Sequence, residues 1–325
     1  MSEKLKEEKQ IKAVSQTAVS TVFDETVYGE DGGVYINPLT DFGFKRIFGE
    51  EANKDLLINF LNAVLKIRGG ISDLTYTNPE RKGRIKTDKS VFFDLHCTTK
   101  AGDRFIIEMQ KLSQKYYKDR SLYYVSFPIQ EQGLRQKKWN YKLHPVYSVN
   151  IVNFLLDGVE RMKDQYIYYI QLIDRDTRKL FYDKLLLVYL ELPGFNKPVE
   201  DLKTNVERWM YVLKHLSKLK ERPAALNDKI FKKFFEQAKI ANMTPEEKKE
   251  YDYSLKNYRD MYTIVDEYKS IVNEYKGENA TMRKMLASNQ KELATKDKAL
   301  QKALAGIEKL RRKFGVNSQT VEIDN

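Results

Sequence analysis

Hydrophobic and polar positions along the first part of the chain recur with the period of a helix. Apolar residues follow this spacing at 42–48 and 56–65, and Thr40 stands where an N-cap would precede the first segment. Gly69 and Gly70 come directly after the second segment, where glycines often end a helix. The pattern predicts two helices at the start of a folded domain.

Shorter apolar segments rich in β-branched and aromatic residues follow, and they predict strands at 71–77, 90–98 and 104–110. The polar residues 99–103 suit a hairpin loop, so these strands should form an antiparallel meander. A helical pattern then covers 116–132, in which Pro128 predicts a kink or an early end. The apolar segment 146–156 predicts a buried strand that joins the sheet in parallel.

Two more strand-like segments, 166–173 and 180–192, should extend the sheet, and helical patterns follow at 201–219 and from about 227. This order of helix, three strands, helix and strand predicts an α/β protein. Its mixed sheet would be flanked by helices.

A seven-residue hydrophobic repeat runs from Met261 to Phe314 and predicts a C-terminal coiled coil that joins the chain into a homo-oligomer. Asn279, Asn289 and Lys296 interrupt the hydrophobic seam, which lowers stability but specifies register or partner number. The alternative is one long helix folded back on the domain. Gly315 is the expected end of this helix.

These patterns divide the chain into five expected parts. They are a disordered leader at 1–33, an α/β domain at 34–195, a helical subdomain at 196–255, a long helix or coiled coil at 256–315, and a frayed tail at 316–325.

Composition narrows the possible environments and partners. Lys and Arg number 57 against 46 Asp and Glu, a net charge of +11 that suits a polyanion such as nucleic acid. The single cysteine, Cys97, excludes an internal disulfide framework and a cysteine-rich zinc site. No segment has the sequence pattern of an export signal or a membrane span, so we expect a cytoplasmic protein without a membrane partner.

Two acidic residues lie within the apolar segments that predict neighbouring strands, Asp94 in one and Glu108 in the other. Partners across a hairpin centred on 99–103 have residue numbers that sum to roughly 202, and this pair meets that sum. Buried carboxylates are costly unless they are paired or bound to a metal. The pair is therefore either a Mg²⁺ site made of hard oxygen ligands or a set of structural ion pairs.

Basic residues that could satisfy the second alternative are Lys45, Arg104 and Arg120. The three histidines are far apart and have no metal-ligand spacing, although His96 lies two residues from Asp94. Glycine-rich phosphate loops are absent from the sequence, which argues against an enzyme of nucleoside triphosphates.

Several motifs resemble those of a known nuclease superfamily. They are the segment 40–49 (TDFGFKRIFG), Leu61-Asn62, Ile107-Glu108-Met109-Gln110, and Arg120 with Tyr123-Tyr124. With the predicted element order, they resemble the PD-(D/E)xK nuclease superfamily and, more closely, its Rpn branch of recombination-promoting nucleases and transposases. The resemblance extends from about residue 36 to residue 192.

This resemblance implies a restriction-endonuclease-like α/β fold and a Mg²⁺-dependent DNA endonuclease associated with recombination or mobile elements. Asp94 and Glu108 would be the metal ligands, and Gln110 would stand at the superfamily's usual lysine position in the catalytic set. Asp41 would be an additional acid, and Arg120 would support the site. Water activated by the metal would attack the phosphodiester bond directly.

A glutamine can form hydrogen bonds but cannot provide the positive charge of a lysine. Either the metal alone activates the water, or a cation such as Lys89 or Arg120 replaces the lysine. Five basic residues are expected to contact the DNA backbone: Lys45, Arg46, Lys111, Lys115 and Lys118. Two alternative functions stay open, a catalytically inactive nucleic-acid-binding module and a structural protein that self-associates through its helical tail.

Overall fold

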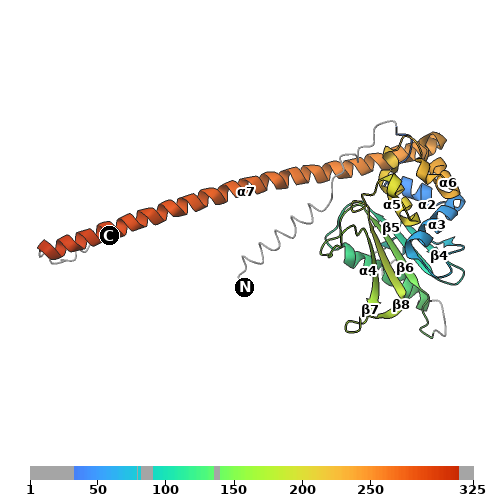
Figure 1. Cartoon of the computed structure of the whole chain (residues 1–325), viewed down its shortest axis with the longest axis horizontal. Helices are drawn as coiled ribbons and strands as arrows, with labels where there is room; N and C mark the ends of the chain where they lie inside the picture. The colour runs from blue at the N-terminus through green and yellow to red at the C-terminus, as the bar shows by residue number, and fades with distance from the viewer. Residues whose placement is uncertain (1–32, 79, 82–90, 135–139, 315–325) are drawn as a thin grey trace. The chain divides into compact units, whose positions relative to one another are not determined.

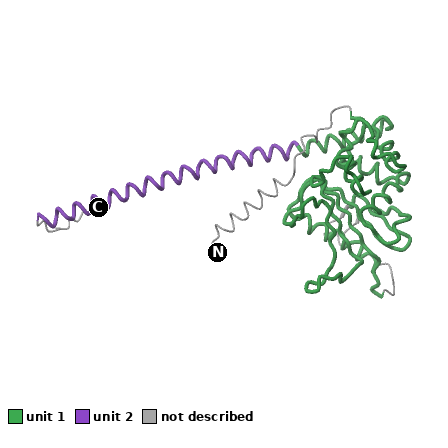
Figure 2. The backbone as a smooth tube through the Cα atoms, in the orientation of Figure 1, with its two compact units in different colours: residues 1–262 green, residues 263–325 purple. Residues whose placement is uncertain are grey.

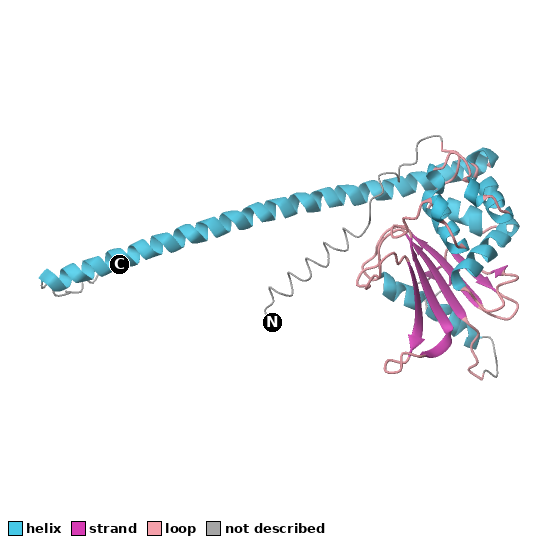
Figure 3. Cartoon of the chain, in the orientation of Figure 1, coloured by secondary structure: helices cyan, strands magenta, loops and turns pink. Residues whose placement is uncertain are grey.

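A six-stranded mixed sheet with helices on both faces forms the centre of the first of two compact units, residues 1–262 and 263–325 (Figures 1–3). The computed structural model describes residues 33–78, 80–81, 91–134 and 140–314. The expected leader, apart from Gly33, lies outside these residues, as do Lys89, Gly315 and the tail.

The strands follow the order β1 (Thr75–Tyr76), β4 (Leu95–Thr98), β5 (Arg104–Gln110), β6 (Val146–Val152), β8 (Leu180–Glu191) and β7 (Ile167–Ile173). β5, β6 and β8 are parallel, whereas β1, β4 and β7 each run antiparallel to the strand that they pair with. The predicted meander and the parallel strand that follows the third helix are both confirmed. This is the α/β fold of restriction-endonuclease type that the sequence predicted.

Two predicted strands are shorter than expected. Of residues 71–77 only Thr75–Tyr76 are in a strand, and the segment 90–98 is divided at Phe93 and Asp94. Its first part, β3 (Val91–Phe92), pairs with β2 (Glu80–Arg81) in a separate two-stranded sheet. The division has a physical cause, because the Asp94 carboxylate accepts the hydrogen bond of a β5 backbone amide and replaces a ladder partner.

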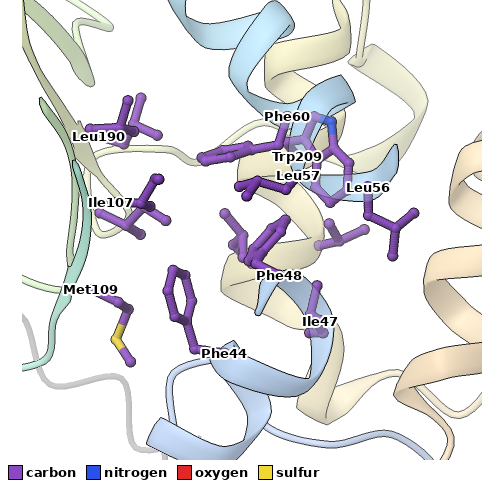
Figure 4. Packing of buried hydrophobic residues seen from close by; sticks show 14 of the residues in the cluster. Phe44, Ile47, Phe48, Leu56, Leu57, Phe60, Ile107, Met109, Leu190 and Trp209 are labelled. Atoms are coloured by element: carbon purple, nitrogen blue, oxygen red, sulfur yellow. The ribbon is translucent and has the colours of Figure 1, made fainter. Parts of the chain in front are cut away.

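Four helices cover one face of the sheet: α2 (Asp41–Phe48), α3 (Lys54–Leu65), α5 (Asn205–His215) and α6 (Lys229–Ala238). Their aromatic residues meet in the main core, where Trp209 contacts Phe48 and Phe60 (Figure 4). As predicted, α2 begins after Thr40, whose hydroxyl accepts the Gly43 amide hydrogen bond at 3.0 Å. A side chain at Gly43 would lie 2.2 Å from the Asn37 carbonyl oxygen, so this turn requires glycine.

The other face of the sheet is covered by α4 (Tyr117–Leu134), which packs over a smaller apolar cluster. Pro128 lies within this helix and does not end it, so the expected early end is wrong. Apolar residues on both sides of the proline, Val125 and Ile129, pack against the cluster. The Gln132 side chain also accepts the His144 amide at 2.7 Å, which holds the last turn in place.

The last helix, α7 (Pro245–Phe314), begins within the first unit and continues through the second. Tyr251, Tyr258 and Tyr262 are its buried residues, and they belong to the main core. No residue from 263 to 314 is buried. Within the described residues, no helix has the length and apolar character needed to cross a membrane.

Candidate functional site

Asp94 and Glu108 come together where β4 begins and β5 ends. Asp94 lies in a bend, its carboxylate accepts the Met109 amide hydrogen bond at 2.6 Å, and its own amide points to a Glu108 carboxylate oxygen 3.3 Å away. The ladder pairs Leu95 with Ile107, so the register sum of 202 holds for the strand pair next to the two acids. The side chain of each acid therefore contacts a backbone amide on the opposite strand.

Burial makes ionisation of both carboxyls unfavourable, and repulsion by Asp94 adds to this effect for Glu108. Glu108 is 6% exposed, and burial together with the nearby Asp94 raises its pKa well above the usual glutamate value. Burial is also the main cause that raises the pKa of Asp94, opposed by the Met109 hydrogen bond. Two acids in this state need a compensating cation if both are to be charged.

Arg120, at the end of the first turn of α4, provides part of that charge. Its guanidinium lies 3.7 Å from a Glu108 carboxylate oxygen and donates to the Gln110 amide oxygen at 3.1 Å. It also donates to Gln114 and packs over the Tyr124 ring at 4.8 Å. The Gln110 amide nitrogen donates to the Leu112 carbonyl at 3.0 Å. Gln110 is thus held at both ends, and Arg120 connects it to Glu108.

Asp41 lies in the first turn of α2, where its carboxylate accepts from Lys111 at 2.8 Å. Its charge contributes to the raised pKa of Asp94, while the charges of Lys45 and Lys111 oppose it. The predicted acid and two predicted basic residues are therefore close enough to act on Asp94 electrostatically. The Lys111–Asp41 ion pair was not expected from the sequence, since the two residues are far apart along the chain.

The five predicted DNA contacts differ in their surroundings. Lys45, Lys115 and Lys118 are exposed, and Lys111 is partly buried. Arg46 is buried, forms an ion pair with Glu247 and donates to the Gln237 carbonyl at 3.1 Å. These contacts indicate that Arg46 connects α2 to both α6 and α7.

A cavity of about 960 Å³ lies beside Asp94. Asp41, Lys45 and His96 line it from α2 and β4, and the first turns of α7 line it with residues that include Lys249, Tyr253 and Asn257. No local sequence pattern relates these α7 residues to Asp94, which lies more than 150 positions away, so they were not predicted. Glu108 and Gln110 do not line this cavity.

The carboxylate pair suits a divalent metal ion. Among the described residues, no three histidine, cysteine, aspartate or glutamate side chains gather as a metal cluster. Mg²⁺ does not need such a cluster, since it is commonly bound by one or two carboxylates together with water and substrate phosphates. Asp94 and Glu108 fit this requirement, and an ion between them would offset the burial that raises both pKa values and the repulsion that Asp94 exerts on Glu108.

The remaining sequence candidates have structural partners. Arg104 pairs with Glu131 at 3.3 Å, and of the ion pairs that the second alternative named, the described residues form that of Glu108 with Arg120. His96 is buried beside Asp94, and its ring nitrogen Nδ1 lies 2.5 Å from the Thr77 hydroxyl. His144 and His215 do not line the cavity.

Comparison with known families identifies the family of this chain's fold and site. The family described as PD-(D/E)XK nuclease family transposase matches residues 38–268, which include the complete sheet and every candidate site residue. No curated protein and no solved structure matches the chain.

Proposed function

This chain belongs to the PD-(D/E)XK nuclease family transposases, and we propose that it is a Mg²⁺-dependent endonuclease that hydrolyses phosphodiester bonds of DNA. The meeting of Asp94 and Glu108 at the end of β5, both with raised pKa values, is the observation that carries the proposal. In an enzyme that binds a divalent ion, such a pair provides the metal ligands. In a protein that binds no ion, the same pair lowers the stability of the fold.

Asp94 and Glu108 would hold the ion. When bound, Mg²⁺ would polarise a water molecule and neutralise the charge that develops on the phosphate. The Met109 amide fixes the orientation of the Asp94 carboxylate, because its hydrogen bond of 2.6 Å uses one of the two oxygens.

Arg120 would supply the positive charge that a lysine at position 110 would have provided. Both polar ends of Gln110 have partners, so its amide is a spacer between Arg120 and the Leu112 carbonyl rather than a ligand of the water. The guanidinium within 3.7 Å of Glu108 keeps that carboxylate oriented and favours its charged form.

Four lysines would contact the DNA backbone: Lys45, Lys111, Lys115 and Lys118. We leave out Arg46, since it is buried and its guanidinium is bonded to both Glu247 and the Gln237 carbonyl. Contacts of this kind give affinity and orientation with little base recognition. The family's description as transposases supports an association with recombination or mobile elements.

Nicking of a supercoiled plasmid tests the proposal. With Mg²⁺, the wild type should nick and both Asp94→Ala and Glu108→Gln should lose about 10²–10³-fold in rate, the range for removal of one group that stabilises transition-state charge. Asp183→Ala, which removes an exposed acid on β8, is the matched control and should keep the wild-type rate.

Equal rates for the wild type and Asp94→Ala would reject the site assignment. A wild type that binds the plasmid without nicking it would favour the inactive binding module. A wild type that neither binds nor nicks would favour a structural protein.

The second unit supports a separate proposal, that α7 joins copies of this chain into a homo-oligomer. Its seam leucines Leu286, Leu293 and Leu300 are 58–63% exposed, and they recur every seven residues. A second copy presents the same repeat and can bury these side chains against its own.

A further inference from the structure

The start of α7 is fixed against α2 by specific contacts. The Tyr251 hydroxyl accepts the Asn37 amide hydrogen bond at 2.8 Å, and the Ser254 hydroxyl accepts that of Phe42 at 3.2 Å. Tyr251 is buried, and its ring packs against Phe42. These contacts determine which side of α7 borders the cavity beside Asp94.

Lys249, Tyr253 and Asn257 line that cavity at intervals of four residues, so they share one side of the helix. Tyr253 is 69% exposed although it lines the cavity. Most of its surface is therefore open to a ligand, and an aromatic ring beside a nuclease site is a platform for a nucleobase.

The cavity also contains the carboxylates of Glu50 and Glu250. These acids can accept hydrogen bonds from the exocyclic amines of a base, and Lys45, which also lines the cavity, can contact the backbone phosphate next to that base. The cavity thus suits a base, while the phosphate would remain at the carboxylate pair of Asp94 and Glu108.

We propose that Tyr253 stacks on the base of an unpaired nucleotide next to the phosphate that is cut, so that the preferred substrate is DNA with single-stranded character. The proposal rests on the proposed nuclease function. A base inside a duplex has both faces covered by its neighbours, so only a base outside the stack can lie on the Tyr253 ring.

Fluorescence of 2-aminopurine in a single-stranded oligonucleotide tests this, because stacking on an aromatic ring quenches the fluorophore. The full chain is titrated in Ca²⁺, a larger ion that also takes oxygen ligands, and compared with a duplex of the same sequence. We expect quenching with the single strand, about tenfold weaker binding without quenching for Tyr253→Ala, and wild-type behaviour for Tyr253→Phe.

Tyr141→Ala is the matched control, since Tyr141 is 80% exposed and does not line the cavity. The variant should bind and quench as the wild type does. Unchanged binding and quenching by Tyr253→Ala would overturn the proposal, as would a wild type that binds the duplex more tightly than the single strand. Absence of nicking in Mg²⁺ with Tyr253-dependent quenching intact would reject the nuclease function and leave the base site supported.

Discussion

The two compact units differ in where their apolar side chains lie. In the first unit, the large aromatic residues on α2, α3, α5 and α6 are fully buried in a shared core. In the second unit, residues 263–314 form a continuous helix in which no residue is buried. The leucines along this helix have exposed fractions of 48–63%. The first unit buries its large apolar side chains within itself, and the second leaves its leucines exposed.

This difference shows that two helices with similar hydrophobic periodicity can be stabilised in different ways. A helix in a globular core is stabilised mostly by packing of its apolar face. A helix without such packing is stabilised by its length and local pairs, of which the 2.7 Å pair of Lys296 with Glu292 is one. The hydrophobic repeat in α7 is the feature on which the proposed homo-oligomer depends.

The largest expected effect is the difference in stability between a phenylalanine substitution in the first unit and one in the second. Phe48→Ala should lower the free energy of unfolding by about 3–5 kcal/mol, because Phe48 is fully buried between Phe44, Phe60 and Trp209. Urea denaturation followed by tryptophan fluorescence measures the loss. Phe314→Ala, at a position that is 72% exposed, is the same change in the second unit and should shift the first unit's transition little. Similar losses for the two variants would contradict the contrast between the units.

A charge in the hydrophobic repeat should disrupt the oligomer and leave the first unit folded. Leu293→Glu should raise the dissociation constant by at least about a hundredfold, since a partner helix would bury an unpaired carboxylate. Sedimentation velocity over a range of concentrations measures this. Ser288→Glu, two positions from the seam residue Leu286, is the control and should keep the oligomer. If both variants sediment as the wild type does, α7 is not the interface.

The first unit's carboxylate pair should make metal binding depend on pH. Because the pKa values of Asp94 and Glu108 are raised, protons compete with Mg²⁺ for them, and binding should weaken as pH falls. The affinity should fall by up to about tenfold per pH unit for each proton released, measured by calorimetry in two buffers of different ionisation enthalpy. Binding that does not change with pH would place the ion elsewhere.

The sequence predicted the helices and strands of the first unit well, because their hydrophobic periods match the faces that they bury. The register that brings Asp94 to Glu108 was also predicted, since a short hairpin loop determines which residues pair. Local patterns could predict these features, as each depends on residues close together in the chain.

Contacts between distant segments could not be predicted in this way. The ion pair of Lys111 with Asp41 and the cavity residues Lys249 and Tyr253 depend on the packing of α2 and α7 around the end of the sheet. The break at Asp94 was also missed, since its carboxylate replaces a backbone partner, and strand propensity does not describe that competition.

A smaller effect should show that the candidate site lowers the stability of the first unit. The folded state raises the pKa of Asp94, so the stability that its protonated form contributes is lost as pH rises through the folded value. Without Mg²⁺ at neutral pH, Asp94→Asn should therefore raise the free energy of unfolding, by at most about 1 kcal/mol, and its amide oxygen can still accept the Met109 hydrogen bond. The gain should vanish below the usual aspartate pKa, where both side chains are neutral.

Saturating Mg²⁺ should reverse this order, because the ion stabilises the wild type by binding its folded form and stabilises Asp94→Asn much less. Thermal denaturation with and without Mg²⁺ measures the difference. Asp297→Asn, which changes an exposed acid of the second unit, should leave the first unit's transition unchanged under both conditions. If Asp94→Asn is less stable than the wild type without Mg²⁺, the carboxylate contributes to the fold as a structural hydrogen-bond acceptor, and the metal-site assignment loses its electrostatic support.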